Sequence, residues 1–278
     1  MTEKILNEIF KAYDVRGRVG KELTPEVAEQ IGQAMAAWLP EAGTIAVGRD
    51  MRPDSSELAG ALIEGLRKQG RDVWDIGEVT SDMIYFVTGH YKLAGGAMVT
   101  ASHNPGDYNG IKLCREGAKP IGEETGLFDI RDLIKAKKFT ATTNKGNLRQ
   151  KDVTEDWIQH ALSFIDPSRL KPLKITVDAG NGMAGKIFPE LEPYVPFEVE
   201  ELYFELDGTF PNHIANPLEP KNLVDLQAAI IKHRCDAGIA FDGDGDRAVL
   251  VDEKGQALSG TVMTVLIRKK FEQVTYLV

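Results

Sequence analysis

Short apolar runs alternate with segments of helical periodicity along most of this chain, and this alternation constrains the fold more than any other feature. The first helix shows the pattern, because Thr24-Pro25-Glu26 supplies an N-cap, a proline and an acidic first turn. The sequence predicts strands at 44–48, 72–76, 96–100, 109–113, 173–177, 198–204, 237–241 and 248–251, and helices at 24–38, 55–68, 81–91, 124–137, 154–165, 184–191, 221–233 and 260–271. Helices that alternate with strands pack on both faces of a mainly parallel sheet. We therefore expect a three-layer α/β fold with mainly parallel, mixed sheets.

The length of the chain and one polar segment predict its division into domains. The chain has 278 residues, enough for about two domains. Residues 138–152 are polar and basic without apolar periodicity, which is typical of a linker. We expect two tandem α/β domains, at residues 1–148 and 149–258. The helix at 260–271 and a strand at 274–278 then begin another α/β unit, so we expect 259–278 to be the truncated start of a third domain.

The composition narrows the class of protein. A hydrophobic content of 42% and a charged content of 27% are ordinary for a soluble globular chain. The net charge of -9 argues against a general nucleic-acid or anionic-membrane binder, since both need a basic face. No signal peptide or membrane-spanning run is visible, which predicts a cytoplasmic protein. Cys114 and Cys235 each adjoin an apolar stretch and are expected to be buried, reduced thiols.

Three carboxylates alternate with glycines between the two last predicted strands of the second domain. Asp242, Asp244 and Asp246 stand at i, i+2 and i+4, so they point to one side of an extended segment. Two such charges about 4 Å apart repel by roughly 4 kcal/mol at an effective dielectric of 20, so a folded chain needs a cation to converge them. Oxygen-only ligands favour Mg²⁺ or a similarly hard ion.

Other interpretations of this acidic segment remain open. It could be a solvated acidic turn. It also matches positions 1, 3, 5 and 12 of a calcium EF-hand loop when Glu253 is included, but position 6 must be glycine there and is Arg247 here. A haloacid-dehalogenase-type phosphatase uses Asp-x-Asp as a nucleophile, near the start of its domain.

A hydroxyl group follows the predicted strand at 96–100, in the segment Thr100-Ala101-Ser102-His103-Asn104-Pro105. Asn104-Pro105 is a turn signal, so a purely structural turn is the alternative. Neighbouring side chains on a turn seldom face each other, so we do not expect Ser102 and His103 to form a pair. The Gly-x-Ser-x-Gly elbow of serine hydrolases is absent. A hydroxyl, a divalent-cation site and an arginine together are the parts of a phosphoryl-transfer site.

Two further segments each have a structural and a functional interpretation. Gly180-Asn181-Gly182-Met183-Ala184-Gly185 matches the dinucleotide fingerprint Gly-x-Gly-x-x-Gly after a predicted strand, which leaves an NAD-dependent oxidoreductase as an alternative. We favour a structural glycine turn there. Tyr13-Asp14-Val15-Arg16-Gly17 is either a surface turn or the site of an arginine whose planar fork clamps a phosphate.

Taken together, these segments resemble the α-D-phosphohexomutase family, and most closely its phosphomannomutase/phosphoglucomutase branch. The resemblance covers essentially the whole chain, and its segments stand in the order of the family: 10–17, 100–105, 177–182, 210–213 and 242–247. The phosphoglucosamine mutase branch is a less similar alternative. It usually opens its first motif with Gly-Thr-Asp-Gly-type residues, where this chain has Lys11-Ala12-Tyr13-Asp14.

The resemblance implies an isomerase that interconverts hexose 1-phosphate and hexose 6-phosphate, with mannose or glucose as the sugar. Ser102 would be the phosphoserine, and a hexose 1,6-bisphosphate would serve as intermediate and activator. Mg²⁺ would be held by Ser102 and by the carboxylates of Asp242, Asp244 and Asp246.

The resemblance also assigns roles to residues around the phosphoserine. Arg16 and Arg247 would lie beside it and bind substrate. Lys112, in Asn109-Gly110-Ile111-Lys112, matches an active-site lysine that assists proton transfer. His103 is a further acid/base candidate, and Tyr13 would line the substrate cleft.

The chain departs from the family on its C-terminal side. Family members have four domains, of which the third reads sugar hydroxyls and the fourth grips the non-transferred phosphate. The loops of the third and fourth domains that make these contacts would be missing here. We therefore expect weak or no turnover by this chain, with an inactive metal-binding fragment as the alternative.

Overall fold

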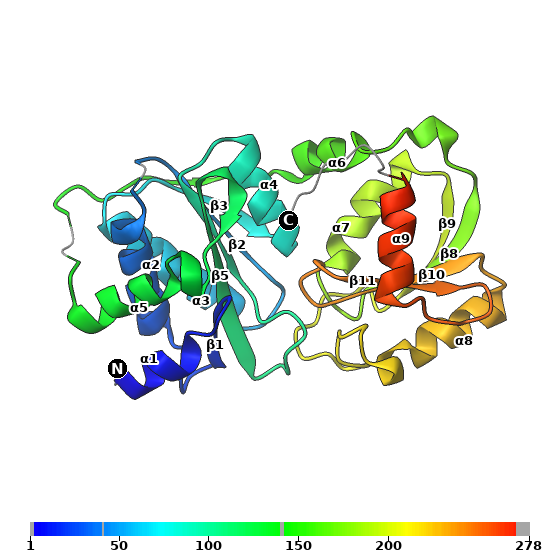
Figure 1. Ribbon diagram of the computed structural model, residues 1–278, viewed down its shortest axis with the longest axis horizontal. Coiled ribbons are helices and arrows are strands. Elements are labelled where there is room, and N and C mark those ends of the chain that lie inside the picture. Colours follow the sequence, from blue (N-terminus) through cyan, green and yellow to red (C-terminus); the bar gives the residue numbers. More distant parts are fainter. Residues whose placement is uncertain (1–2, 41, 140–141, 271–278) are drawn as a thin grey trace.

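The computed structural model describes residues 3–40, 42–139 and 142–270, which form two α/β domains side by side (Figure 1). The first domain contains α1 (Glu3–Ile9), β1 (Val15–Arg18), α2 (Pro25–Trp38), β2 (Ile45–Arg49), α3 (Ser55–Lys68), β3 (Val73–Glu78), α4 (Ser81–His90), β4 (Gly95–Val99), β5 (Tyr108–Arg115), β6 (Lys119–Pro120), α5 (Leu127–Ala136) and β7 (Leu148–Gln150). The second contains α6 (Thr154–Leu162), β8 (Leu173–Asp178), α7 (Ala184–Leu191), β9 (Phe197–Leu202), α8 (Val224–His233), β10 (Ala237–Phe241) and β11 (Ala248–Asp252), and α9 (Gly260–Lys270) follows.

Both sheets are mixed and mainly parallel, as the alternation of elements predicts. The first has the strand order β1-β5-β4-β2-β3-β7, in which β4, β2, β3 and β7 are parallel and β5 is antiparallel to both of its neighbours, β4 and β1. The second has the order β11-β10-β8-β9, in which only the pairing of β11 with β10 is antiparallel. The carboxyl ends of β4 and β10 lead directly into the serine segment and the acidic segment.

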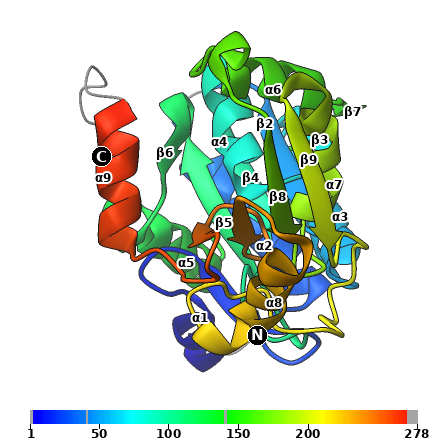
Figure 2. The same ribbon diagram turned by 90° about the vertical axis from the view of Figure 1, so that its right-hand side faces the viewer.

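Helices cover both faces of each sheet. In the first domain α2, α3 and α5 enclose the larger apolar core, and α4 lies on the opposite face toward the second domain (Figure 1). The core beneath α4 also includes Trp157 and Ile187, so apolar packing continues across the junction. In the second domain α8 packs on β8 and β10 through Leu226 and Ile230. Figure 1 shows α8 below this sheet, and Figure 2 shows α9 to one side.

Most predicted elements lie within one or two residues of their observed bounds, but segment 138–152 does not act only as a linker. Residues Leu148–Gln150 form β7, which pairs with β3 in parallel as an edge strand. All of its residues are exposed, and they lack the alternation of apolar and polar side chains from which a strand is predicted. The helix predicted at 124–137 is interrupted at Gly126, whose φ of 123° ends a short 3₁₀ turn before α5 begins.

The first residues also contain structure that we did not predict. Helix α1 lies against α5, and β1 pairs antiparallel with β5 so that Arg16 is opposite Gly110. Cys114 and Cys235 are buried and unpaired, which confirms the expectation for both. The helix predicted at 260–271 is present as α9, whereas the strand at 274–278 lies outside the described residues. None of the described helices is long and apolar enough to cross a bilayer.

Candidate active site

The serine loop (residues 100–108) and the acidic loop (residues 242–247) meet where the two domains join. Ser102 Oγ donates a hydrogen bond of 2.6 Å to Asp242 Oδ2, although the two residues are 140 positions apart in the sequence. The two backbones also nearly touch. A Cβ atom on Gly243 would lie 2.4 Å from the carbonyl oxygen of Ser102, so only glycine permits this approach.

Ser102 has a left-handed backbone, with φ of 51°. This conformation costs a non-glycine residue roughly 1–2 kcal/mol, and a hydrogen bond of 2.9 Å from the Ser102 amide to Thr100 Oγ1 supports it. It also brings His103 Nδ1 to 3.2 Å from Ser102 Oγ. Our expectation that the two side chains would not face each other is therefore wrong, because it assumed ordinary turn geometry.

The environment of His103 favours the neutral form of its imidazole. Burial lowers its pKa, and the positive charges of Arg247 and Arg16 lower it further. The imidazole is consequently neutral near pH 7, with Nδ1 directed at the Ser102 hydroxyl.

The three aspartates of the acidic loop converge. Their carboxylate oxygens lie within 4.8 Å of one another, and Asp242 and Asp244 are completely buried. Burial, followed by the charges of Asp244 and Asp246, raises the pKa of Asp242 to about 7. Asp244 Oδ1 is buried without a hydrogen-bond partner. Converging hard oxygens with one of them unused fit a divalent cation such as Mg²⁺.

Lys112 extends from β5 to the same carboxylates. Its Nζ lies 2.6 Å from Asp244 Oδ2 and 2.7 Å from Asp246 Oδ2. Burial by itself would lower the pKa of Lys112, but the two carboxylates outweigh it and raise that pKa, which keeps the side chain an ammonium. Burial by itself would likewise raise the pKa of Asp244, but Lys112 and Ser81 lower it to about 2.

Ser81 is a site residue that the sequence analysis missed. It is the first residue of α4, its amide donates to the Asp244 carbonyl and its hydroxyl donates to the Asp244 carboxylate. The positive end of the α4 dipole therefore faces the acidic loop.

Arg247 connects the two loops. Its Nη2 donates to Ser102 Oγ at 2.6 Å and to Asp242 Oδ2 at 2.6 Å, and it also contacts His103 Nδ1. A guanidinium held beside the serine hydroxyl can bind a phosphoryl oxygen there.

Arg16 and Tyr13 lie further from the hydroxyl. Arg16 donates to the carbonyl of Ala101 and to Asn104 Oδ1, both at 2.6 Å, and also to Asp14, so its described hydrogen bonds reach the serine loop but not Ser102 itself. Tyr13 is 87% exposed and lines a cavity of about 500 Å³ together with Lys112 and Asp246.

The glycine fingerprint in the second domain has a packing role. A Cβ on Gly185 would lie 2.2 Å from the Phe204 carbonyl oxygen, and one on Gly182 would lie 2.8 Å from the Gly243 carbonyl oxygen. The amide of Met183, just before α7, donates to that same Gly243 carbonyl. The start of α7 therefore packs against the acidic loop. In a dinucleotide-binding fold the pyrophosphate would bind at this helix start, so the contact favours the structural interpretation over an oxidoreductase.

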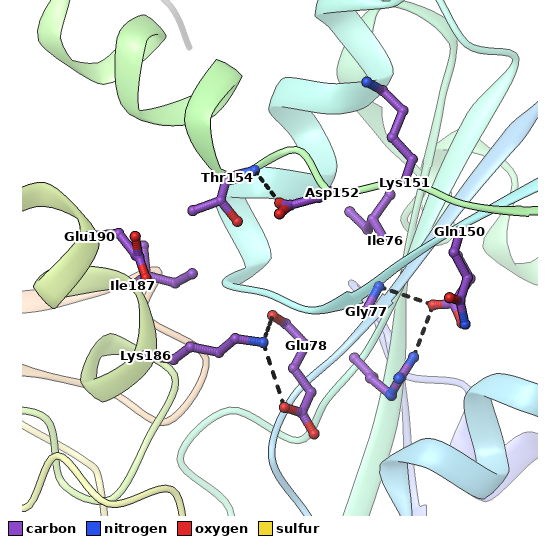
Figure 3. A pocket seen from close by; sticks show the side chains of 12 residues that line it. Ile76, Gly77, Glu78, Gln150, Lys151, Asp152, Thr154, Lys186, Ile187 and Glu190 are labelled. Atoms are coloured by element: carbon purple, nitrogen blue, oxygen red, sulfur yellow. Dashed lines mark hydrogen bonds and ion pairs between the residues drawn. The ribbon is translucent and has the colours of Figure 1, made fainter.

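A second cavity, of about 610 Å³, lies between β3 and α7, and none of the nine predicted site residues lines it (Figure 3). Its main charges are paired with one another. Lys186 Nζ lies 3.6 Å from the Glu78 carboxylate across the domain junction, and Arg49 donates to Asp75 at 2.9 Å. We assign no chemistry to this cavity.

Family models and known proteins match both domains of this chain. Residues 7–141 match the model described as phosphoglucomutase/phosphomannomutase, alpha/beta/alpha domain I, and residues 155–255 match domain II. The phosphohexose mutase of Xanthomonas campestris pv. campestris is 47% identical over 93% of this chain and 57% of its own length. The phosphomannomutase of Vibrio cholerae is 42% identical over 95% of this chain and 59% of its own length.

A solved structure from Burkholderia thailandensis, of a phosphoglucomutase/phosphomannomutase family protein, superimposes with a TM-score of 0.85 and 35% identity. It covers 97% of this chain, which in turn covers 60% of that protein. The chain thus spans less than two thirds of the length of these relatives. With both family models matched in order and relatives above 40% identity, the chain belongs to the phosphoglucomutase/phosphomannomutase family.

Proposed function

We propose that this chain carries the phosphoryl-transfer centre of a phosphohexomutase that interconverts hexose 1-phosphate and hexose 6-phosphate. One observation carries the proposal: Ser102 Oγ lies 2.6 Å from both a carboxylate of the acidic loop and the Arg247 guanidinium. The names of the relatives, phosphohexose mutases and phosphomannomutase, support a phosphorylated hexose as substrate. We propose mannose or glucose as the sugar.

In the proposed half-reaction, a hexose 1,6-bisphosphate transfers one phosphoryl group to Ser102. A bond forms between Ser102 Oγ and phosphorus while the bond between phosphorus and the sugar oxygen breaks. His103, which lies 3.2 Å from Ser102 Oγ, takes the hydroxyl proton, and the Lys112 ammonium is placed to protonate the sugar oxygen that leaves. In the full cycle, phospho-Ser102 transfers its phosphoryl group to the free hydroxyl of a hexose monophosphate. The bisphosphate so formed turns over and returns its other phosphoryl group to Ser102, which releases the isomeric monophosphate.

Charge stabilisation is the second contribution of the site. Arg247 is placed to bind the transferred group, and Arg16 holds the loop that presents Ser102. We propose that Asp242, Asp244, Asp246 and Ser102 hold Mg²⁺, which when bound supplies a Lewis acid for the charge that develops on the phosphoryl oxygens. Tyr13 lies in the wall of the adjoining cavity, where the sugar would bind.

The two domains would have different functions in this reaction. A phosphoserine domain at residues 1–148 would be followed by a metal-binding domain at 149–258, and residues 259–278 would begin a third domain. The relatives contain further sequence that this chain does not match, so selection of the sugar and binding of the non-transferred phosphate would depend on that sequence.

The test is to follow release of hexose monophosphate by ³¹P NMR after mixing the chain with glucose or mannose 1,6-bisphosphate and Mg²⁺. We expect about one equivalent of monophosphate per chain and none from Ser102→Ala. Absence of release from the wild type with Mg²⁺ bound would contradict the proposal and leave an inactive metal-binding fragment.

A further inference from the structure

Arg52 lies beneath the serine loop, and four of the five N–H groups of its guanidinium donate hydrogen bonds to that loop. Its side chain is 1% exposed, and its Nε lies 3.3 Å from the fully buried carboxylate of Asp50. The four remaining N–H groups donate, at 2.6–2.9 Å, to backbone carbonyls of the serine loop: those of Ser102, Asn104, Pro105 and Tyr108. A guanidinium has five N–H donors in a rigid plane, and here both terminal nitrogens use both of their donors on one loop, while Nε only forms the ion pair with Asp50.

These contacts fix the part of the loop that determines where the Ser102 hydroxyl points. The carbonyl of Ser102 accepts from Arg52 at 2.9 Å, and Ser102 has the uncommon φ of 51°. Rotation of that peptide toward an ordinary conformation would break this hydrogen bond and swing Ser102 Oγ away from Asp242. Asp50 neutralises the buried guanidinium, and its Oδ1 also accepts from the Arg52 amide at 3.1 Å.

The same guanidinium contacts the second domain through Phe210. Arg52 Cζ lies 5.0 Å from the centroid of the Phe210 ring, which is buried between the two loops. The ring edge reaches Gly243, because a Cβ placed there would lie 3.4 Å from Phe210 Cζ. Arg52 therefore contacts the serine loop directly and the acidic loop through one ring.

We propose that Arg52 is the positioning residue that holds Ser102 in its left-handed conformation and in register with the acidic loop. It touches neither the Ser102 hydroxyl nor the three aspartates, so it acts through the backbone. The catalytic part of this inference rests on the proposed function, because it concerns the hydroxyl that would accept phosphate.

Arg52→Lys is the informative variant, since lysine keeps the charge opposite Asp50 but cannot reach four carbonyls from one nitrogen. We expect the rate of phosphate uptake from glucose 1,6-bisphosphate to fall about 100-fold, the penalty typical of a reacting group misplaced by about 1 Å. Mg²⁺ affinity, measured by calorimetry, should change less than twofold. Arg71→Lys is the matched control, because Arg71 caps the carbonyls of Ala36 and Leu39 at the other end of the domain.

Hydrogen exchange tests the positioning role without any turnover. The amides of Asn104 and Tyr108 donate within the serine loop, to Ala101 and Pro105. In Arg52→Lys they should exchange at least tenfold faster than in the wild type, and in Arg71→Lys at the wild-type rate. Unchanged exchange of these two amides in Arg52→Lys would overturn the inference. If the wild type takes up no phosphate, the proposed function fails and exchange alone decides the role of Arg52.

Chemical rescue distinguishes positioning from a general loss of structure. Millimolar guanidinium added to Arg52→Ala should refill the site, slow the exchange of both amides and restore at least a tenth of the uptake rate. Ammonium at the same concentration should not. Equal effects of the two cations, or no effect of guanidinium, would refute a specific positioning role.

Discussion

Replacing Lys112 by methionine tests how the acidic loop is stabilised. Lys112 Nζ contacts the buried Asp244 carboxylate at 2.6 Å and the partly exposed Asp246 carboxylate at 2.7 Å. Methionine keeps most of the length and apolar contact of the lysine but removes its charge. The variant therefore leaves three carboxylates within 4.8 Å of one another, and among the described residues Arg247 is the basic side chain that still pairs with Asp242 and Asp246.

The expected loss follows from burial. Removing one partner of a buried ion pair costs about 3–5 kcal/mol, because the other charge is left uncompensated. Solvent screens Asp246, so we expect the lower end, about 3 kcal/mol, in the presence of a chelator. For a chain of this size that corresponds to a Tm lower by roughly 6–12 °C. Saturating Mg²⁺ should recover most of the loss, since the bound ion supplies the missing positive charge.

Thermal unfolding in EDTA and in excess Mg²⁺ measures both effects. Lys174→Met is the control, because Lys174 bridges Glu198 and Glu200 at 2.8 and 2.9 Å on an open surface, and its loss should barely change the Tm. A Lys112→Met variant as stable in EDTA as the wild type would refute this reasoning. So would an equal loss with and without Mg²⁺.

Three further predictions follow from individual contacts. Asp244→Asn should weaken Mg²⁺ binding at least tenfold by calorimetry, and an unchanged titration would move the metal site elsewhere. Gly243→Ala should lower the free energy of unfolding in urea by about 1–3 kcal/mol, because the new Cβ would lie 2.4 Å from the Ser102 carbonyl oxygen; a neutral result would mean that the two loops are not in contact. Burial lowers the pKa of His213, but Asp178, whose Oδ2 lies 3.0 Å away, outweighs it and raises that pKa. This pair stabilises the fold fully below the unfolded pKa of about 6.5 and loses that effect as the pH rises through the higher folded pKa. The stability gap between wild type and His213→Gln should therefore narrow as the pH rises above about 6.5, and a constant gap would contradict the assignment.

The two loops could be predicted from the sequence because their residue types and spacing indicate their chemistry without knowledge of distant partners. Asp242, Asp244 and Asp246 alternate between two apolar strands, and Ser102 follows another, so parallel strands place both groups at sheet edges. The contact between Ser102 and His103 could not be predicted in the same way. It depends on a left-handed φ at a serine, for which no local residue pattern is diagnostic.

Residues whose partners lie far away in the sequence escaped the prediction. Arg52 acts on carbonyls about 50 positions away, and Ser81 donates to a carboxylate 163 positions away. Only their position in the sequence could have indicated a role, since both follow a predicted strand of the sheet that carries Ser102. Edge strand β7 was missed because its exposed residues show no alternation.

The proposed function requires that Ser102 exchange phosphate with a phosphorylated hexose. The most direct measurement is the intact mass of the chain, with peptide mapping, before and after incubation with hexose 1,6-bisphosphate and Mg²⁺. We predict a single added phosphate, located on Ser102 and lost when the product is chased with hexose monophosphate. A chain that binds Mg²⁺ but gains no phosphate, or gains it at another residue, would contradict the claim.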